Sequence, residues 1–164
     1  MRLKDSFCSY CGQPFAPDQL WPRTCAHCGE MSFQNPAPVA VVVVPIDGGL
    51  LAVRRGIEPA RGQLSLPGGY INRGETWQQA GARELREETG LTVGPEDIQL
   101  FNVLSNPAGI FVIVFGLAPA QPASALAVFT PNEETQECVV LRQFEALAFP
   151  LHTQVAREFF ERQT

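Results

Sequence analysis

Three glutamates near the middle of the chain are spaced so that they could act together. Glu84, Glu87 and Glu88 fall within roughly 100° of arc if the segment between Thr76 and Gly90 is helical, because each residue turns an α-helix by about 100°. Carboxylates crowded on one face repel one another unless water solvates them or cations neutralise them. Carboxylate oxygens are also the ligands that Mg²⁺ and Mn²⁺ take, usually shared with substrate phosphates. The face is therefore either a solvated charged surface or a divalent-metal site.

The elements that would position these glutamates can also be read from the sequence. Thr76 and Gln79 form a T-x-x-Q capping box, which predicts the start of a helix. Gly90 stands where a left-handed residue would end that helix. Ahead of the helix lies the segment 66–70, L-P-G-G-Y, whose consecutive glycines permit positive φ and a close backbone approach. Such a loop could offer backbone groups to a phosphate or a metal beside the helix.

The stretch from 69 to 91 resembles the signature of the Nudix hydrolases, G-x5-E-x7-R-E-U-x-E-E-x-G-U with U aliphatic. Every fixed position of that signature is filled, by Gly69, Glu75, Arg83, Glu84, Leu85, Glu87, Glu88, Gly90 and Leu91. The resemblance implies an α+β fold, the Nudix-type α/β/α sandwich with a mixed sheet. It also implies metal-dependent hydrolysis of the diphosphate bond in a nucleoside diphosphate linked to another group.

The resemblance assigns roles to individual residues. Glu84 is the candidate general base, Arg83 is expected to orient a carboxylate by ion pairing, and Glu75 supports the site from further out. A divalent cation, Mg²⁺ or Mn²⁺, is expected to bind to Glu84, Glu87, Glu88 and the backbone of Gly69.

Residues outside the helix could contact the substrate. Arg54 and Arg55 end an expected strand, where they are either surface charges or hold a pyrophosphate oxygen. The backbone of Gly68 and Gly69 would approach the same ligand. In some Nudix hydrolases a glutamate from a distant loop acts as base or metal ligand. Three residues of a polar segment could supply it here, unless they are solvated loop charges: Glu133, Glu134 and Glu137.

Four cysteines near the N-terminus form a C-x2-C pair of motifs, at Cys8, Cys11, Cys25 and Cys28. Four thiolates close a tetrahedral Zn²⁺ site without an open position, so the zinc would be structural. Two disulfides are the alternative, which a reducing compartment disfavours. We expect a zinc ribbon over residues 1–34 and a Nudix domain over 35–164. The ribbon and the F-x-N-P-x-P-V segment that starts at Phe33 resemble the NADH pyrophosphatase branch of the family.

The composition limits the partners of this chain. It has 164 residues, 45% of them hydrophobic, and a net charge of −5, which argues against a general nucleic-acid or membrane-surface binder. Its strand-like apolar run 39–44 is far shorter than the ~20 residues of a membrane span. No signal peptide pattern stands at the start. We therefore expect a cytoplasmic protein with a nucleotide-type small-molecule substrate, and the resemblance suggests a homodimer.

The substrate is predicted less sharply. NADH pyrophosphatases carry an S-Q-P-W-P-F array, of which segment 104–109 keeps Ser105 and Pro107. ADP-ribose is therefore the leading expectation, with the related ADP-linked compounds NADH and FAD behind it. The alternatives are a nucleoside triphosphate or RNA-cap pyrophosphohydrolase, and a non-catalytic nucleotide-sensing regulator. The last is disfavoured because every carboxylate of the signature is present.

The remaining pattern predicts strands and a closing helix around the glycine loop. Strands are expected at 39–45, 50–54, 98–104, 110–117 and 138–143, a surface loop at 118–131 and a helix at 153–162. We expect His152 to be a cap or surface residue. Four aromatic residues are candidates for stacking on a base: Phe33, Tyr70, Phe101 and Phe111.

Overall fold

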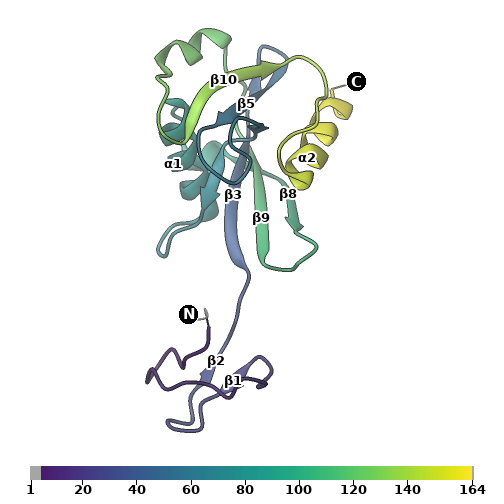
Figure 1. Ribbon diagram of the computed structural model, residues 1–164. Coiled ribbons are helices and arrows are strands. Elements are labelled where there is room, and N and C mark those ends of the chain that lie inside the picture. Colours follow the sequence, from purple (N-terminus) through teal and green to yellow (C-terminus); the bar gives the residue numbers. More distant parts are fainter. Residues whose placement is uncertain (1–4, 164) are drawn as a thin grey trace. The chain divides into compact units, whose positions relative to one another are not determined.

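The computed structural model describes residues 5–163 and is shown in Figure 1. The chain divides into two units, the first ending at Pro36 and the second beginning at Ala37. In the smaller unit, β1 (Arg23–Thr24) pairs antiparallel with β2 (Met31–Ser32). Across the described residues, no helix has both the length and the apolar character needed to cross a membrane.

The larger unit is built on two sheets. In the first, β3 runs parallel to β9, while β7 pairs antiparallel with β3 and β8 antiparallel with β9. The bounds of these strands are β3 Ala37–Val43, β7 Gly68–Tyr70, β8 Gln99–Ser105 and β9 Phe111–Leu117. In the second sheet, the central β5 pairs antiparallel with three strands. The bounds there are β5 Gly49–Arg55, β4 Pro45–Ile46, β6 Leu64–Ser65 and β10 Thr135–Leu141.

Helices cover the strands on both sides. The α-helices are α1 (Trp77–Thr89) and α2 (Pro150–Glu161), and the short 3-10 helices are η1 (Pro95–Asp97) and η2 (Ala123–Val128). Figure 1 shows α1 and α2 on opposite sides of the strands. The mixed first sheet and these helices confirm the predicted α+β class.

Alternating side chains of β3 explain why both sides are covered. Successive residues of a strand point to opposite faces. Val41 and Val43 accordingly join a buried cluster that includes Val155 of α2, whereas Val42 joins a second cluster that includes Leu85 of α1. A strand that is apolar on both faces needs a partner layer on each. The run of valines therefore accounts for the sandwich of helix, strands and helix.

Strand β10 begins earlier than the sequence predicted. Thr135 pairs with Arg55 of β5 and Glu137 pairs with Arg54, so the antiparallel ladder extends three residues ahead of Cys138. The placement of Glu137 in a loop was therefore wrong. Pairing with a distant strand overrode the polar character of the segment.

Helix α2 also begins earlier, at Pro150 rather than Thr153. Proline is favoured in the first turn of a helix, because its missing N–H has no partner there and its φ is already set. His152 consequently lies inside the first turn and is buried. The expectation that His152 is a cap or surface residue was wrong.

Candidate active site

Helix α1 is fixed at both ends. The Oγ1 atom of Thr76 accepts a hydrogen bond from the N–H of Gln79 at 3.2 Å, and Oε1 of Gln79 accepts one from the N–H of Thr76 at 2.8 Å. Gly90 ends the helix with a left-handed φ of 77°. Both predicted caps are thus confirmed. They hold Glu84 and Glu88, one turn apart, at a fixed place along the helix.

Two glycines bring the backbone of β7 against α1. The N–H of Gly68 donates to Oε2 of Glu88 at 2.9 Å. A methyl group on Gly69 would overlap the carboxylate of Glu84, and one on Gly68 would overlap the backbone of β3. Glycine is required at both positions because no side chain fits between these elements.

Arg83 connects the helix to the loop that precedes it. Its guanidinium binds Glu75 through two bonds, Nε to Oε1 at 2.7 Å and Nη2 to Oε2 at 3.1 Å. Its Nη1 donates to Glu84 at 2.8 Å and to Glu87 at 3.0 Å, and Nη2 donates to the carbonyl of Tyr70 at 3.0 Å. The bonds from Arg83 lower the pKa of Glu75 to about 2, and the carboxylates raise the pKa of Arg83. One side chain therefore orients three carboxylates.

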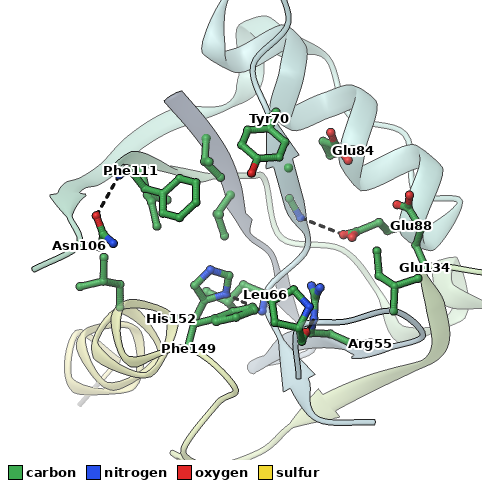
Figure 2. A pocket seen from close by; sticks show the side chains of 18 of the residues that line it. Arg55, Leu66, Tyr70, Glu84, Glu88, Asn106, Phe111, Glu134, Phe149 and His152 are labelled. Atoms are coloured by element: carbon green, nitrogen blue, oxygen red, sulfur yellow. Dashed lines mark hydrogen bonds between the residues drawn. The ribbon is translucent and has the colours of Figure 1, made fainter. Parts of the chain in front are cut away.

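Three carboxylates converge beside the glycine loop. One oxygen each from Glu84, Glu88 and Glu134 lies within 4.8 Å of the other two. Figure 2 shows Glu84 and Glu88 projecting from α1 on the side where Glu134 lies. Burial raises the pKa of Glu88 to about 8, with the charges of Glu84 and Glu134 adding to the effect, and burial also raises the pKa of Glu84. Hard oxygens crowded in this way are a donor set that fits Mg²⁺ or Mn²⁺.

Glu87 lies outside this group of three. Its side chain is 50% exposed and is paired with Arg83 at 3.0 Å. To share a cation with Glu84 and Glu88, it would have to leave Arg83. The structure thus brings together two of the three glutamates proposed from the signature, and adds Glu134 from the distal segment.

The position of Glu134 is set by Asn132. The Oδ1 atom of Asn132 accepts hydrogen bonds from the N–H groups of Glu134 at 2.9 Å and Thr135 at 2.8 Å. Its Nδ2 donates to the backbone carbonyl of Glu87 at 3.0 Å. The segment that carries Glu134 is therefore tied to the helix that carries the other two carboxylates.

A cavity of about 810 Å³ opens beside these carboxylates. Its volume is that of a small-molecule site, for which roughly 300–1,000 Å³ is usual. Figure 2 shows the acidic side chains along one part of it and aromatic rings along the rest. The apolar and aromatic lining comes mainly from Val39, Val41, Leu66, Tyr70, Phe111, Ile113 and Phe149. The arrangement suits a ligand with an anionic group at one end and a flat or apolar group at the other.

The two predicted arginines are placed differently. Arg55 lines the cavity, with its guanidinium carbon 5.1 Å from the ring centre of Phe149 and its Nε donating to the carbonyl of Pro59 at 2.7 Å. Arg54 is not among the lining residues, and its Nε pairs with Glu137 at 2.7 Å. Neighbouring residues of β5 face opposite sides of the sheet, which separates them.

Two of the four aromatic candidates reach the cavity. Tyr70 and Phe111 both line it, with ring centres 6.3 Å apart. Phe101 is instead buried in the core beneath Arg162, whose guanidinium carbon lies 3.9 Å from the centre of its ring. Phe33 belongs to the smaller unit.

Comparison with known proteins identifies the family. The family model described as NUDIX domain matches residues 36–163. This chain belongs to the Nudix hydrolase family. Among curated relatives, the NAD-capped RNA hydrolase NudC from Salmonella heidelberg (strain SL476) is 35% identical over 88 residues, which are 53% of this chain and 34% of NudC. This similarity agrees with the branch of the family that the motifs suggested, but the chain covers only 34% of the length of that relative.

Solved structures confirm the Nudix fold. The NUDIX hydrolase from Nitrosomonas europaea superposes with a TM-score of 0.80 and 28% identity, covering 96% of this chain and 92% of that one. The NUDIX domain of Shewanella oneidensis NrtR, complexed with ADP ribose, gives a TM-score of 0.64 and 23% identity, covering 80% of this chain and 91% of that one. The second likeness shows the fold alone.

The smaller unit of this Nudix protein holds a second ligand cluster. The sulfurs of Cys8, Cys11, Cys25 and Cys28 all lie within 4.8 Å of one another. The Cys8–Cys28 and Cys11–Cys25 sulfurs are 3.7 and 3.6 Å apart, and all four cysteines are free thiols. A tetrahedral ion with Zn–S bonds of about 2.3 Å places its sulfurs roughly 3.8 Å apart. The cluster therefore fits a closed zinc site.

Sequence reasoning assigned no function to two residues that line the cavity, Phe149 and His152. The signal that could have found them is Pro150. A proline in the first turn predicts a helix start at that position, and so places His152 on α2 facing the core.

Proposed function

We propose that this protein hydrolyses the diphosphate bond of ADP-ribose or a related ADP-linked compound, such as NADH or FAD, with Mg²⁺ or Mn²⁺ as cofactor. The observation that carries this proposal is the position of Glu84, Glu88 and Glu134 at one wall of a cavity of about 810 Å³. A diphosphate held at that wall leaves the apolar remainder of the cavity for the rest of a nucleotide. The ADP ribose bound to the Shewanella neighbour supports the same class of ligand.

The reaction adds one water to a phosphorus of the diphosphate. The bond from that phosphorus to the bridging oxygen breaks, and two phosphate monoesters leave, AMP and ribose 5-phosphate in the case of ADP-ribose. A bound divalent cation would neutralise the charge that develops on the phosphoryl oxygens. The proton of the attacking water passes to a carboxylate, for which Glu84 is the first candidate and Glu134 the second.

Other residues of the site position these groups. Arg83 donates a hydrogen bond to the carboxylate of Glu84, which lies close to the backbone of Gly69. The N–H of Gly68 does the same for Glu88. Arg55 presents a fork of N–H donors at the cavity, which suits a phosphate oxygen. Glu87 is proposed as a further cation ligand that would exchange its pairing with Arg83.

We also propose that the four cysteines bind Zn²⁺ in a structural ribbon formed by residues 1–34, ahead of a catalytic domain at 35–164. The geometry of the sulfurs supports zinc, and the closed set of four leaves no position for a substrate.

A second candidate substrate is the NAD cap of RNA. The name of the relative from Salmonella heidelberg, NAD-capped RNA hydrolase, favours it. The chemistry at phosphorus would be the same, but the net charge of −5 offers little attraction for the RNA that follows the cap.

A substrate panel tests the proposal. Purified protein is incubated with Mg²⁺ or Mn²⁺ and, separately, ADP-ribose, NADH, FAD, NAD-capped RNA and a nucleoside triphosphate, and the products are separated by anion-exchange chromatography. We expect AMP from an ADP-linked compound, abolished by EDTA. Release of pyrophosphate from the triphosphate alone, or turnover that survives EDTA, would overturn it.

A further inference from the structure

His152 is a buried polar side chain that faces the cavity. It is 7% exposed, and its ring stands edge-on to those of Phe115 and Phe149, with centres 5.7 and 5.1 Å away. It lines the cavity together with Leu66 and Phe149. A polar ring in such apolar surroundings needs hydrogen-bond partners for both nitrogens.

One nitrogen of this ring has its partner. The N–H of Leu66 donates to Nδ1 of His152 at 3.2 Å, so Nδ1 acts as an acceptor and carries no proton. Burial, with a smaller effect of the positive charge of Arg55, lowers the pKa of His152 to about 4, and the ring is neutral at physiological pH. The single proton of a neutral ring whose Nδ1 accepts must then reside on Nε2.

The second nitrogen has no partner among the residues that the structure describes. No hydrogen bond to Nε2 of His152 exists among residues 5–163, and this atom is not enclosed by protein. Figure 2 shows the ring nitrogen that is not bonded to Leu66 facing the open part of the cavity, toward the side where Tyr70 and Phe111 lie. The fold thus presents an N–H donor, fixed in direction, in the part of the cavity that has aromatic walls.

The surroundings of this donor indicate what it binds. A sugar carries several hydroxyl groups, each of which needs a polar partner when buried. The wall beside His152 is instead formed by Phe149 and Leu66, and Phe111 lines the same cavity. A planar heterocycle fits them, because its faces are apolar and its acceptor atoms lie in the plane of the ring.

We propose that Nε2–H of His152 donates a hydrogen bond to an acceptor atom in the ring plane of the substrate's nucleobase, and so positions the nucleotide and contributes to base specificity. This rests on the proposed function, since the diphosphate at the carboxylates directs the base to the opposite end of the cavity. For an adenine base the acceptor is one of its ring nitrogens, N1, N3 or N7.

Two substitutions at this position separate the donor from the structural role of the ring. His152→Asn places an amide oxygen where Nδ1 lies, which keeps an acceptor for the N–H of Leu66 but removes the donor in the cavity. His152→Gln reaches further and restores an amide N–H near the position of Nε2. His27→Asn is the matched control, because His27 is exposed in the smaller unit.

The test measures binding and turnover separately. The affinity for ADP-ribose is determined by calorimetry without added divalent metal, and KM and kcat are determined with Mg²⁺. We expect His152→Asn to weaken binding and raise KM about tenfold, because one neutral hydrogen bond is lost. The kcat value should change little, His152→Gln should recover most of the affinity, and His27→Asn should behave as wild type.

Analogues of the ligand test the same bond without altering the protein. In three ADP-ribose analogues, N1, N3 or N7 of the adenine is replaced by C–H. One of them should bind wild type about tenfold more weakly, and should bind His152→Asn no more weakly than ADP-ribose does. Equal binding of all three analogues to wild type, or wild-type affinity in His152→Asn, would overturn the inference, as would a wild-type protein that binds no ADP-ribose.

The outcomes distinguish this inference from the proposed function. If wild type binds ADP-ribose through His152 but hydrolyses none of the ADP-linked compounds of the panel, the proposed function fails and the recognition of the base stands. If wild type hydrolyses ADP-ribose and His152→Asn has an unchanged KM, the inference fails alone.

Discussion

The two ligand clusters of this chain differ in what they leave open. The four cysteines belong to one small unit, and their sulfurs already have the spacing of a tetrahedral zinc site. The three carboxylates come from α1 and from the segment before β10, and they border a cavity. Soft ligands in a complete set hold a fold together, whereas hard ligands in an incomplete set leave positions on a cation for substrate oxygens.

The clusters also differ in how they are stabilised. Each C-x2-C motif places its two cysteines close together, and the two motifs then meet, with Cys8 against Cys28 and Cys11 against Cys25. Burial, and after it the charges of Glu84 and Glu134, raise the pKa of Glu88 to about 8. The carboxylates are held in place by Arg83, Gly68 and Asn132. The comparison therefore predicts that metal removal unfolds one region and leaves the other folded but inactive.

The largest effect should follow from breaking the sulfur cluster. Cys25 is buried, and Cys25→Ser removes one of four zinc ligands. Structural zinc contributes on the order of 10–16 kcal/mol to modules of this kind, more than a unit of this size has from its own core. We expect zinc below one equivalent per chain by mass spectrometry, and loss of amide dispersion for residues 5–36 in NMR spectra. Full zinc content in this variant would contradict a four-sulfur site.

The next effect concerns the carboxylates. Glu88→Gln should lower kcat roughly 10³-fold, because an oxygen ligand of the cation is lost. Zinc content should stay at one equivalent, and the melting temperature in EDTA should not fall below that of wild type. Glu87→Gln should lose less, because Glu87 lies outside the group of three. If Glu87→Gln were the more damaged variant, the grouping of Glu134 with Glu84 and Glu88 would not describe the active site.

Gly69→Ala should have an intermediate effect. Its methyl group would displace the carboxylate of Glu84, and a shift of about 1 Å at a reacting group costs up to roughly 10²-fold in rate. Because the damage acts through Glu84, the same change in a Glu84→Gln background should cost much less than in wild type. Steady-state rates of the four proteins give this coupling directly. Independent, multiplicative losses would show that Gly69 acts by another route.

The smallest effect is expected from the pH dependence of stability. The pKa of Glu75 is about 2 in the folded state against an ordinary 4.5, so its ionised form favours folding above pH 4.5. That contribution is lost as the pH falls from 4.5 toward 2. The difference in melting temperature between wild type and Glu75→Gln should therefore be largest near pH 6 and shrink at pH 3. The exposed Glu145 gives the control, Glu145→Gln, for which a similar trend would contradict a specific pairing with Arg83.

The parts that sequence reasoning predicted are those with local signals. The capping box at Thr76 and Gln79 and the left-handed Gly90 define α1 within a few residues, and both are present in the structure. The two C-x2-C motifs likewise predict a cluster, because each motif brings two sulfurs together in one turn. In the first sheet, β3 and β9 follow from runs rich in β-branched residues, whereas β7 was expected to be a glycine loop and is a short strand paired with β3.

The parts that sequence reasoning missed or left open depend on contacts between distant segments. Glu134 is 46 residues from Glu88, and the pairing of β10 with β5 and the bonds of Asn132 bring it beside α1. Arg54 and Arg55 look equivalent in sequence, but their side chains lie on opposite faces of the sheet. Arg55 therefore lines the cavity, and Arg54 pairs with Glu137. The burial of His152 follows from the early start of α2. The spacing of residues within one segment does not predict contacts of this kind.

The amide of Asn132 has a consequence for how relatives of this protein could diverge. It joins the backbone of α1 to the backbone just ahead of β10, downstream of the stretch 118–131, which was expected to be a surface loop and contains the 3-10 helix η2. Insertions or deletions in that stretch can therefore accumulate while the acidic trio keeps its spacing. Because no residue of 118–131 lines the cavity, such changes in length would leave the walls around the ligand as they are.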